Sequence, residues 1–360
     1  MPRTYCSISH AALRHNLQRV RQLRPEASIL AMVKADAYGH GLVEVAKALQ
    51  PGVEALGVAV LDEAIVLRQA GIKIPVVLMQ GVFSLQELAA ARIHDLQLVV
   101  HQQRQLDWLL QTPGTPLTIW LKVNTGMNRL GFRPEMLPGV WSQLQQATAV
   151  RQIILMTHLA MADMPTESLT SQQHHCFMAC QQSLGIADAQ TSLCNSAGIL
   201  AWPQLGGHWV RPGLMLYGAS PFAAQCAADL QLQPVMRLYS RVMAIQQVRA
   251  GEIVGYAGCW QAKEDQRIAI VSCGYGDGYP RTAPSGTPVA IEGAIYPLAG
   301  RVSMDMLAVD IGHAPVSVDA EVELWGEQVP VDAVAAAAGT LAYELFCKVT
   351  DRVPFYQRIH

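Results

Sequence analysis

Short apolar runs alternate with amphipathic segments along the first two thirds of the chain. In the amphipathic segments apolar residues recur at helical spacing, as at Leu13, Leu17 and Val20. The runs between them have the length and β-branched content of buried strands, and lie at residues 28–33, 55–60, 75–79, 96–100, 117–123, 153–158, 192–195 and 209–211. Repeated strand–helix units of this kind predict an α/β fold with a (β/α)8 TIM-type barrel, with an open doubly wound sheet as the alternative.

The pattern changes near residue 230. Beyond it come short apolar runs separated by turns that contain glycine and proline, at residues 241–248, 252–256, 267–272, 287–291, 306–309 and 321–324. Because these runs leave little room for long helices, they predict a mostly β domain, with short helices expected only at 331–338 and 343–349. We therefore predict a barrel domain over residues 1–231 and a mostly β C-terminal domain over residues 232–360.

Composition and charge exclude several classes of partner. The formal net charge of −2 gives no basic surface, so we expect no nucleic acid or anionic membrane as a partner. No apolar run reaches the roughly 20 residues that cross a bilayer, and the N-terminus lacks the apolar core of a signal peptide. The 8 cysteines are scattered, without a Cys-x-x-Cys pair, so we expect neither a metal site nor a disulfide framework. These features predict a cytoplasmic protein.

The predicted first barrel strand ends in Lys34. A lysine that follows a buried apolar run must find a partner or lose its charge, because an isolated ammonium is costly away from water. A lysine with a lowered pKa, or one condensed with an aldehyde as a Schiff base, is a reactive amine. The structural alternative is a lysine at a strand end that reaches into solvent.

Other polar side chains follow the later strands of the predicted barrel. The fifth strand leads to Lys122, the sixth to His158, the seventh to Ser196 and the eighth to Arg211. Active sites of such barrels lie at the carboxyl ends of the strands, and the last two loops often bind phosphate. Beside a reactive lysine, a phosphate site indicates either pyridoxal 5′-phosphate (PLP) or a phosphosugar bound by an aldolase.

The residues around Lys34, Met-Val-Lys-Ala-Asp-Ala-Tyr-Gly-His-Gly at 32–41, resemble the PLP-attachment signature of alanine racemases. Further segments match that family in order and approximate spacing, so the resemblance covers essentially the whole chain; they lie at 122–131, 156–158, 195–196, 210–221, 254–256, 274–281, 300–306 and 343–344. The resemblance implies a bacterial PLP enzyme that interconverts L- and D-alanine, for peptidoglycan supply or D-alanine breakdown. It also implies a head-to-tail homodimer with shared active sites.

The resemblance also implies a role for individual residues. Lys34 would bind the cofactor and act as one acid/base, and Tyr256 of the partner's β domain would act as the other. Arg211 would face the pyridine nitrogen, supported by His158. Because arginine keeps its proton, the ring should be a weaker electron sink than one that faces an aspartic acid. The phosphate would be surrounded by Tyr38, Ser196, Gly213, Leu214 and Tyr343.

The substrate side of the site is implied in the same way. Arg129 would reach the phenolic oxygen of PLP and the substrate carboxylate, which the backbone N–H of Met304 would also bind. Tyr275 would line the entry and restrict the substrate to a small amino acid. Lys122 matches a lysine that is often carbamylated in relatives. Many relatives have aspartate where this chain has Asn124, and this difference leaves the carbamylation open.

Three alternatives remain open on the sequence. A non-catalytic PLP carrier would share only the barrel and would lack a β domain with a residue such as Tyr256. A PLP decarboxylase of the same fold would be expected to have an acidic or histidine-centred arrangement in place of residues 254–258. A racemase of broader, serine-directed specificity would generally be exported and disulfide-bonded.

Overall fold

The computed structural model describes residues 2–358 of the chain. By its internal contacts the chain divides into two compact units, which we call the barrel unit and the β unit. The barrel unit comprises Leu17–Ala37 and Gly41–Leu216, and the remaining described residues form the β unit. The two units correspond to the two kinds of hydrophobic pattern in the sequence.

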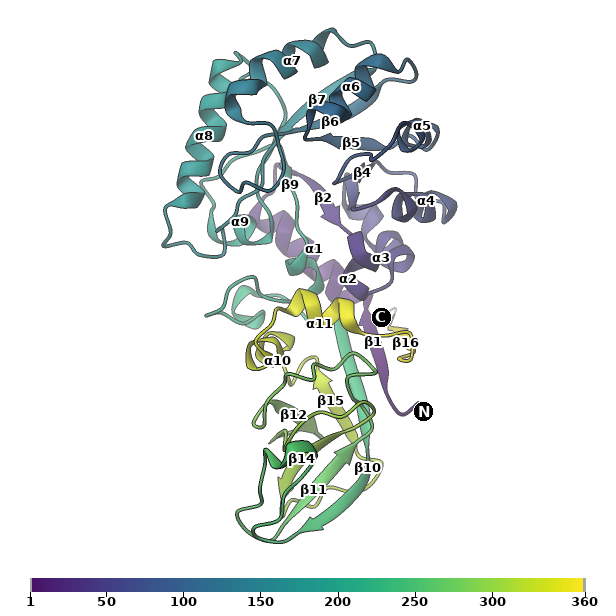
Figure 1. Ribbon diagram of the computed structural model, residues 1–360, viewed down its shortest axis with the longest axis vertical. Coiled ribbons are helices and arrows are strands. Elements are labelled where there is room, and N and C mark those ends of the chain that lie inside the picture. Colours follow the sequence, from purple (N-terminus) through teal and green to yellow (C-terminus); the bar gives the residue numbers. More distant parts are fainter. Residues whose placement is uncertain (1, 359–360) are drawn as a thin grey trace. The chain divides into compact units, whose positions relative to one another are not determined.

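The barrel unit contains a closed barrel of parallel strands in which sequence neighbours are also spatial neighbours (Figure 1). Its strands are β2 (Ser28–Met32), β3 (Ala55–Val58), β4 (Val76–Leu78), β5 (Gln97–Val100), β6 (Leu117–Lys122), β7 (Val150–Met156), β8 (Thr191–Ser192) and β9 (Trp209–Val210). β2 pairs with both β3 and β9, which closes the barrel. The predicted TIM-type barrel is confirmed, because each predicted apolar run overlaps one of these strands.

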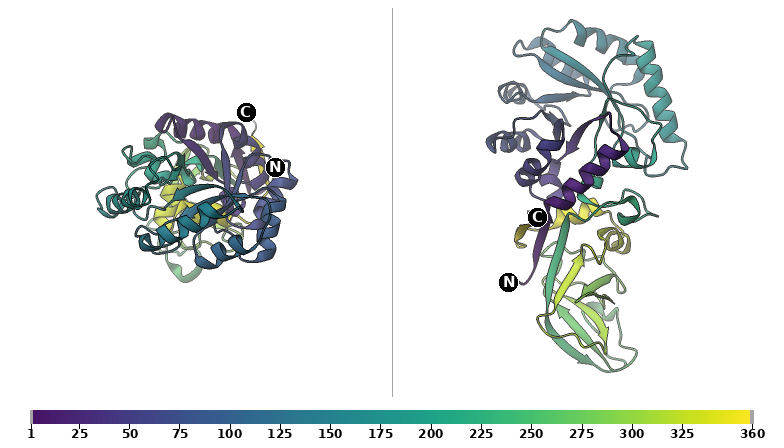
Figure 2. Two further views of the ribbon diagram at one scale, coloured as in Figure 1. Left: turned by 90° about the horizontal axis from the view of Figure 1, so that it is seen from above. Right: turned by 180° about the vertical axis from the view of Figure 1, so that it is seen from behind.

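Helices surround the strands of the barrel, as the view from above in Figure 2 shows. The helices in this part of the chain are α1 (His10–Leu23), α2 (Lys34–Gly39), α3 (Leu42–Leu49), α4 (Leu61–Gln69), α5 (Leu85–Ile93), α6 (Gln103–Gln111), α7 (Leu137–Gln146), α8 (Leu169–Ser183) and α9 (Ser196–Ala201). Short 3-10 turns are η1 (Gln50–Gly52), η2 (Pro134–Met136) and η3 (Leu214–Tyr217). Packing follows the sequence pattern: α3 buries Leu42, Val45 and Leu49 along one face.

The β unit is built on a sheet with the strand order β13-β12-β15-β10-β1-β16, and β11 joins β10 to β14. Its strands are β1 (Tyr5–Ser9), β10 (Met236–Val248), β11 (Gln266–Val271), β12 (Pro288–Ile291), β13 (Ala294–Pro297), β14 (Leu307–Gly312), β15 (Glu321–Trp325) and β16 (Phe355–Arg358). The predicted late helices are present as α10 (Val331–Ala338) and α11 (Ala342–Lys348), and η4 (Ala228–Leu230) and η5 (Tyr256–Gly258) are 3-10 turns.

The two ends of the chain meet in this sheet. β1 pairs antiparallel with β10 and parallel with β16, so the strands nearest the two termini lie side by side (Figure 1). The predicted domain 1–231 includes β1, whereas the contacts place this strand in the β unit. The sequence pattern predicted neither β1 nor β16. Such short strands are stabilised by their neighbours in the sheet more than by their own sequence.

One predicted strand is wrong. Residues 252–256 do not form a strand: only Ile253 makes an isolated bridge, to Gln261, and the 3-10 turn η5 begins at Tyr256. Gly255 has φ 75° and Ala257 has φ 63°, which are left-handed conformations. An extended strand requires a negative φ at each residue, so this backbone must turn.

Three further observations concern the described residues as a whole. No helix within residues 2–358 combines the length and apolar character needed to span a bilayer. No group of three or more His, Cys, Asp or Glu side chains in that range could hold a metal ion. The cysteines of the described chain form no disulfide bonds.

Candidate active site

Lys34 lies directly beyond the carboxyl end of β2. The N–H of Val33 still donates to the carbonyl of Gly57 at 2.9 Å, as the next rung of the parallel sheet, and α2 begins at Lys34. The apolar run before the lysine is buried, as predicted, but Lys34 itself is exposed in this chain. The expected burial of the lysine is therefore not found. The last sheet hydrogen bond of this strand is made by Val33, one residue before Lys34, so the side chain of Lys34 is on the rim of the barrel.

The backbone after Lys34 forms a left-handed helical turn. Ala35, Asp36, Ala37 and Tyr38 have φ values of 54°, 52°, 54° and 55°. A left-handed helix costs roughly 1–2 kcal/mol for each residue with a Cβ, because the Cβ approaches the following carbonyl oxygen. Conformations of this kind persist where the surroundings determine them, and they cluster at functional sites.

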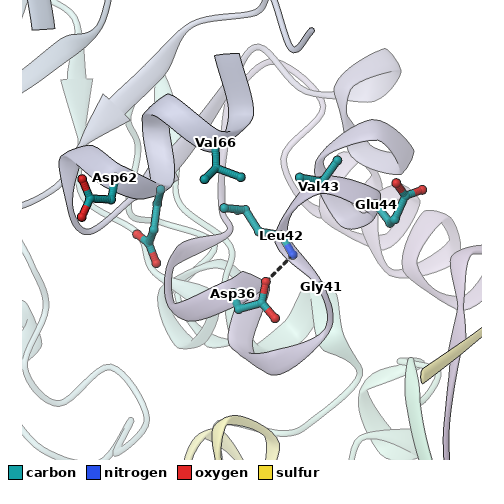
Figure 3. A pocket seen from close by; sticks show the side chains of 8 residues that line it. Asp36, Gly41, Leu42, Val43, Glu44, Asp62 and Val66 are labelled. Atoms are coloured by element: carbon teal, nitrogen blue, oxygen red, sulfur yellow. Dashed lines mark hydrogen bonds between the residues drawn. The ribbon is translucent and has the colours of Figure 1, made fainter. Parts of the chain in front are cut away.

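Two carboxylates hold this turn. Glu63 accepts the N–H of Ala35 at 2.5 Å with one oxygen and the N–H of Ala59 at 2.7 Å with the other. Asp36 accepts the N–H of Leu42 at 2.6 Å, as the dashed line in Figure 3 marks. Figure 3 also shows the pocket beside this turn, which contains none of the predicted cofactor- or substrate-binding residues; it is lined by Asp36, Gly41, Leu42, Val43, Glu44, Asp62, Glu63 and Val66.

Arg211 follows β9 and is fully buried, with neutral hydrogen-bond acceptors around it. Its guanidinium donates to the hydroxyl of Ser192 at 2.6 Å and to the carbonyl oxygens of Thr157 at 2.7 Å and Leu193 at 3.1 Å. Burial lowers the pKa of Arg211 to about 10. It therefore still has its proton at neutral pH, as a buried cation directly after the carboxyl end of β9.

His158 lies against this guanidinium. Its Nδ1 is 3.3 Å from Nη2 of Arg211. Burial, then Arg211 and Lys122, hold the pKa of His158 well below its usual value. A neutral imidazole can accept a hydrogen bond, and only an accepting Nδ1 can pair with an arginine, which is always a donor. The structure thus brings these two predicted residues into contact.

Lys122 ends β6 among other cations. Its pKa falls to about 8, through burial first and then through the charges of Arg211, Arg129 and Lys34. The positive charges of four predicted site residues, Lys34, Lys122, Arg129 and Arg211, therefore repel one another at the carboxyl end of the barrel. Such a concentration of positive charge is stabilised by an anion. The site fits a ligand with a phosphate, a phenolate or a carboxylate.

Ser196 connects the last two loops of the barrel. It is the first residue of α9, whose N-cap Asn195 accepts the N–H of Gly198 at 3.0 Å. The hydroxyl of Ser196 accepts the N–H of Gly213 at 3.0 Å and the N–H of Met215 at 3.3 Å. These contacts hold the hydroxyl of Ser196, which can itself donate, at the position where barrels often bind phosphate.

Several supporting residues were not predicted from the sequence. Gln173 of α8 is fully buried; it accepts the N–H of Ala160 at 2.8 Å and donates to the carbonyl of His158 at 2.9 Å. The hydroxyls of Thr125 and Thr157 are 2.7 Å apart and join the loops after β6 and β7. Gln173 lies on the buried face of α8 with Phe177 and Cys180, and a glutamine at helical spacing from such residues is the signal that could have identified it.

Asn124 orders the loop that leads to Arg129. Its side-chain oxygen accepts the N–H groups of Gly126 at 3.2 Å and Asn128 at 3.0 Å. Its amide nitrogen also donates to the side-chain oxygen of Asn128 at 3.1 Å. An ionised aspartate could accept both backbone bonds but could not donate this third one.

A second group of predicted residues lies in the β unit. Tyr38 is buried and stacks on Tyr217, with the ring centroids 4.8 Å apart, and Tyr343 lies 5.8 Å away. Burial raises the pKa of Tyr38, with smaller contributions from Tyr343 and Cys347. Its hydroxyl therefore remains protonated and can donate a hydrogen bond to an anion.

The predicted catalytic tyrosine and the predicted substrate residues of the β unit are exposed in this chain. Tyr256 is 68% exposed and Met304 is 52% exposed. The N–H of Tyr275 donates to the carbonyl of Ser303 at 3.0 Å, so the loops with Tyr275 and Met304 lie together. Within this unit, a Cβ placed on Gly255 would lie 3.7 Å from the backbone nitrogen of Arg301. The turn that contains Tyr256 therefore lies beside the segment that leads to Met304.

Comparison with known proteins also divides the chain into two parts. The alanine racemase N-terminal domain matches residues 8–221, and the alanine racemase C-terminal domain matches residues 235–357. The alanine racemase of Vibrio cholerae is 46% identical over 96% of both chains, and the catabolic alanine racemase of Pseudomonas putida is 47% identical over 96% of both. The crystal structure of the biosynthetic alanine racemase of Pseudomonas aeruginosa superposes with a TM-score of 0.96 at 42% identity, covering 99% of this chain and 100% of that one. Because the similarity extends through both domains and nearly the whole length of each relative, this chain belongs to the alanine racemase family.

Proposed function

We propose that this protein interconverts L-alanine and D-alanine by moving the α-proton between two bases on opposite faces of the substrate. The observation that supports this most strongly is the similarity to alanine racemases over 96% of the chain at 46% identity. The named relatives include a biosynthetic and a catabolic enzyme, and both D-alanine supply for peptidoglycan and D-alanine breakdown are consistent with them. None of their names supports the serine-directed alternative.

The cofactor that we propose is PLP, and the chemistry of the barrel mouth fits it. When bound, PLP supplies an electron sink that makes the α-proton of an amino acid easier to remove. The cations around Lys122 would meet its anionic groups, and Lys34 would hold it covalently. Arg211 would donate to the ring nitrogen without giving up its proton, while neutral His158 keeps the guanidinium in place.

The phosphate would be held by hydrogen-bond donors among the residues that the resemblance implies. The hydroxyl of Ser196, ordered by its bonds to the N–H groups of Gly213 and Met215, is one donor. The protonated hydroxyl of Tyr38 is another. Leu214 and Tyr343 complete the proposed set.

The chain's own side chains would move the protons. Lys34 would serve one face of the α-carbon, and Tyr256 of a second copy would serve the other, so neither base has to swing around the substrate. The 68% exposure of Tyr256 in a single chain supports its use by a partner subunit. Arg129 and the N–H of Met304 would bind the carboxylate, and Tyr275 would limit the side chain to a small one. We accordingly propose a homodimer in the cytoplasm with shared active sites.

Exchange of the α-hydrogen with heavy water, measured for a panel of small amino acids, tests this function. We expect deuterium at the α-carbon of alanine in both directions, with serine exchanged far more slowly. Lys34→Ala should abolish the visible absorbance of the bound cofactor that borohydride reduces, and an unchanged band would contradict the role of Lys34. A protein that binds the cofactor but exchanges no α-hydrogen would instead be a carrier.

A second measurement separates the two bases. Tyr256→Phe removes the hydroxyl but retains the ring, so the cofactor absorbance should persist while exchange from L-alanine falls by about 100-fold or more. Exchange from D-alanine should fall much less, because Lys34 would remain on that face. Equal losses from the two enantiomers would contradict the division of labour between Lys34 and Tyr256.

A further inference from the structure

A buried carboxylate, Asp277, lies between two arginines in the β unit. Its side chain is fully buried, and Oδ1 accepts a hydrogen bond from Nη2 of Arg3 at 2.6 Å. Nε of Arg352 is 3.7 Å from the same oxygen, and Oδ2 accepts the N–H of Gly274 at 3.0 Å. One carboxylate thus joins residues near both ends of the chain to the loop that contains Tyr275.

The two arginines extend these contacts to a second loop. Arg3 also donates from Nη1 to the carbonyl of Ser272 at 2.8 Å. Arg352 donates from Nη2 to Oδ1 of Asp305 at 2.7 Å. Asp305 directly follows Met304. Both arginines contact Asp277 in the loop that contains Tyr275. Arg3 also contacts Ser272 before that loop, and Arg352 also contacts Asp305 in the loop that contains Met304.

The backbones of the two loops are in direct contact. The N–H of Tyr275 donates to the carbonyl of Ser303 at 3.0 Å, and that of Gly276 donates to the carbonyl of Met304 at 2.9 Å. A Cβ at Gly274 would collide with the carbonyl oxygens of Ser303 and Met304, so glycine is required for this approach. A displacement of one loop must therefore move the other.

We propose that Arg3, Asp277 and Arg352 form a positioning clamp that sets the affinity of the enzyme for the carboxylate of its substrate. The inference rests on the proposed function, in which the N–H of Met304 binds that carboxylate and Tyr275 limits the side chain. Removing a cationic partner of a buried carboxylate is strongly destabilising, because it leaves the buried charge uncompensated. Removal of one arginine would shift Gly274 and, through the backbone contacts, Met304.

These residues act through the two loops, so their removal should weaken binding more than it slows proton transfer. A mutation that removes binding shared by the ground state and the transition state raises KM and leaves kcat unchanged. For Arg3→Met and Arg352→Met we expect KM for L- and D-alanine to rise about tenfold with kcat within about twofold, which corresponds to a loss of about 1.4 kcal/mol of binding. The cofactor absorbance should be that of the parent enzyme.

Steady-state kinetics of the full-length holoenzyme in both directions, with absorbance spectra, provide the test. Because both arginines hold the same carboxylate, the double variant should raise KM by less than the product of the single effects. Arg3→Lys retains the charge and should restore most of the affinity. Arg237→Met is the matched control, since Arg237 pairs with Glu327 in the same unit; its KM should not change.

The outcomes separate the clamp from the proposed function. If KM stays at the parent value in both single variants, or if kcat and the cofactor band are lost with KM unchanged, the clamp is refuted. Multiplicative effects in the double variant would also refute it, because the arginines would then act independently. If the unmodified enzyme exchanges no α-hydrogen of alanine, the proposed function itself has failed.

Discussion

Lys122 illustrates how a single residue of this site depends on its surroundings. It ends a buried strand, and the side chains that shift its pKa after burial are the cations Arg211, Arg129 and Lys34. A pKa of about 8 leaves part of the amine uncharged near neutral pH. A neutral amine is the form that reacts with carbon dioxide, so the lowered pKa favours the carbamylation that the sequence leaves open at Lys122. Lys122 has this lowered pKa with Asn124, and not aspartate, in the adjoining loop.

The stability of the cofactor-free protein should reflect this lysine. Lys122 releases its proton at about pH 8 in the folded protein, against an ordinary value of 10.5. Between those values the unfolded chain binds more protons, so this residue's contribution to the free energy of unfolding rises with pH from about 8 to about 10.5. Below pH 8 Lys122 is charged in both the folded and the unfolded chain, so the full free-energy cost of burying its charge lowers the stability of the folded protein.

Lys122→Met should therefore be more stable than the parent at pH 7, by on the order of 2 kcal/mol. The difference should shrink as the pH rises toward 10. Urea unfolding of the two proteins at several pH values, in phosphate-free buffer, measures it. Lys73→Met, at an exposed position, is the control and should show no such trend. A variant no more stable than the parent at pH 7 would contradict the prediction.

At the scale of elements, α2 is the unusual one. Its residues Ala35 to Tyr38 have left-handed conformations, and Glu63 and Asp36 hold them through backbone N–H groups. The turn follows Lys34 directly and therefore determines where the chain goes after the proposed attachment point. Its strain is offset by these hydrogen bonds and by the packing of Ala37, which is fully buried.

Glycine should be tolerated in α2 better than in an ordinary helix. Ala35 is exposed with φ 54°, so Ala35→Gly relieves roughly 1–2 kcal/mol of left-handed strain and costs up to about 1 kcal/mol in unfolded-state entropy. We expect an unfolding free energy equal to the parent's or up to about 1 kcal/mol higher. Ala89→Gly, at an exposed position of right-handed α5, should instead lose about 1 kcal/mol. Equal losses in the two variants would show that α2 is not left-handed in solution.

At the scale of the whole molecule, the proposed bases come from the two different units of the chain. Lys34 lies in the barrel unit and Tyr256 in the β unit. If each active site takes its lysine from one copy and its tyrosine from another, inactivating variants of the two residues should complement each other. A dimer with one copy of each variant would have one site without either residue and one intact site.

Mixing Lys34→Ala with Tyr256→Phe, followed by subunit exchange, should restore about a quarter of the parent activity. Random exchange makes half of the dimers mixed, and one of the two sites in each is intact. Racemisation of L-alanine measures the recovery, and native mass spectrometry verifies that mixed dimers form. Mixed dimers without activity would mean that both bases belong to the same chain.

The sequence alone determined those features that depend on neighbouring residues. Alternation of apolar runs and amphipathic segments predicted the barrel strands β2 to β9, since a strand or helix must bury its apolar face wherever it packs. The motif around Lys34, and the polar residues after the later strands, predicted that polar side chains gather at the carboxyl ends of the barrel strands. Residues 252–256 were misjudged because apolar content outweighed the glycine that turns the chain.

Only the tertiary structure decided features that depend on residues far apart in the chain. Gln173 supports His158 from another element, and Arg3 meets Asp277 across 274 positions. The pKa of Lys122 depends on Arg211, which follows a different strand. The exposure of Lys34 depends on where the sheet ends. Burial and electrostatic interactions arise from spatial neighbours, so no local pattern of residues can encode them by itself.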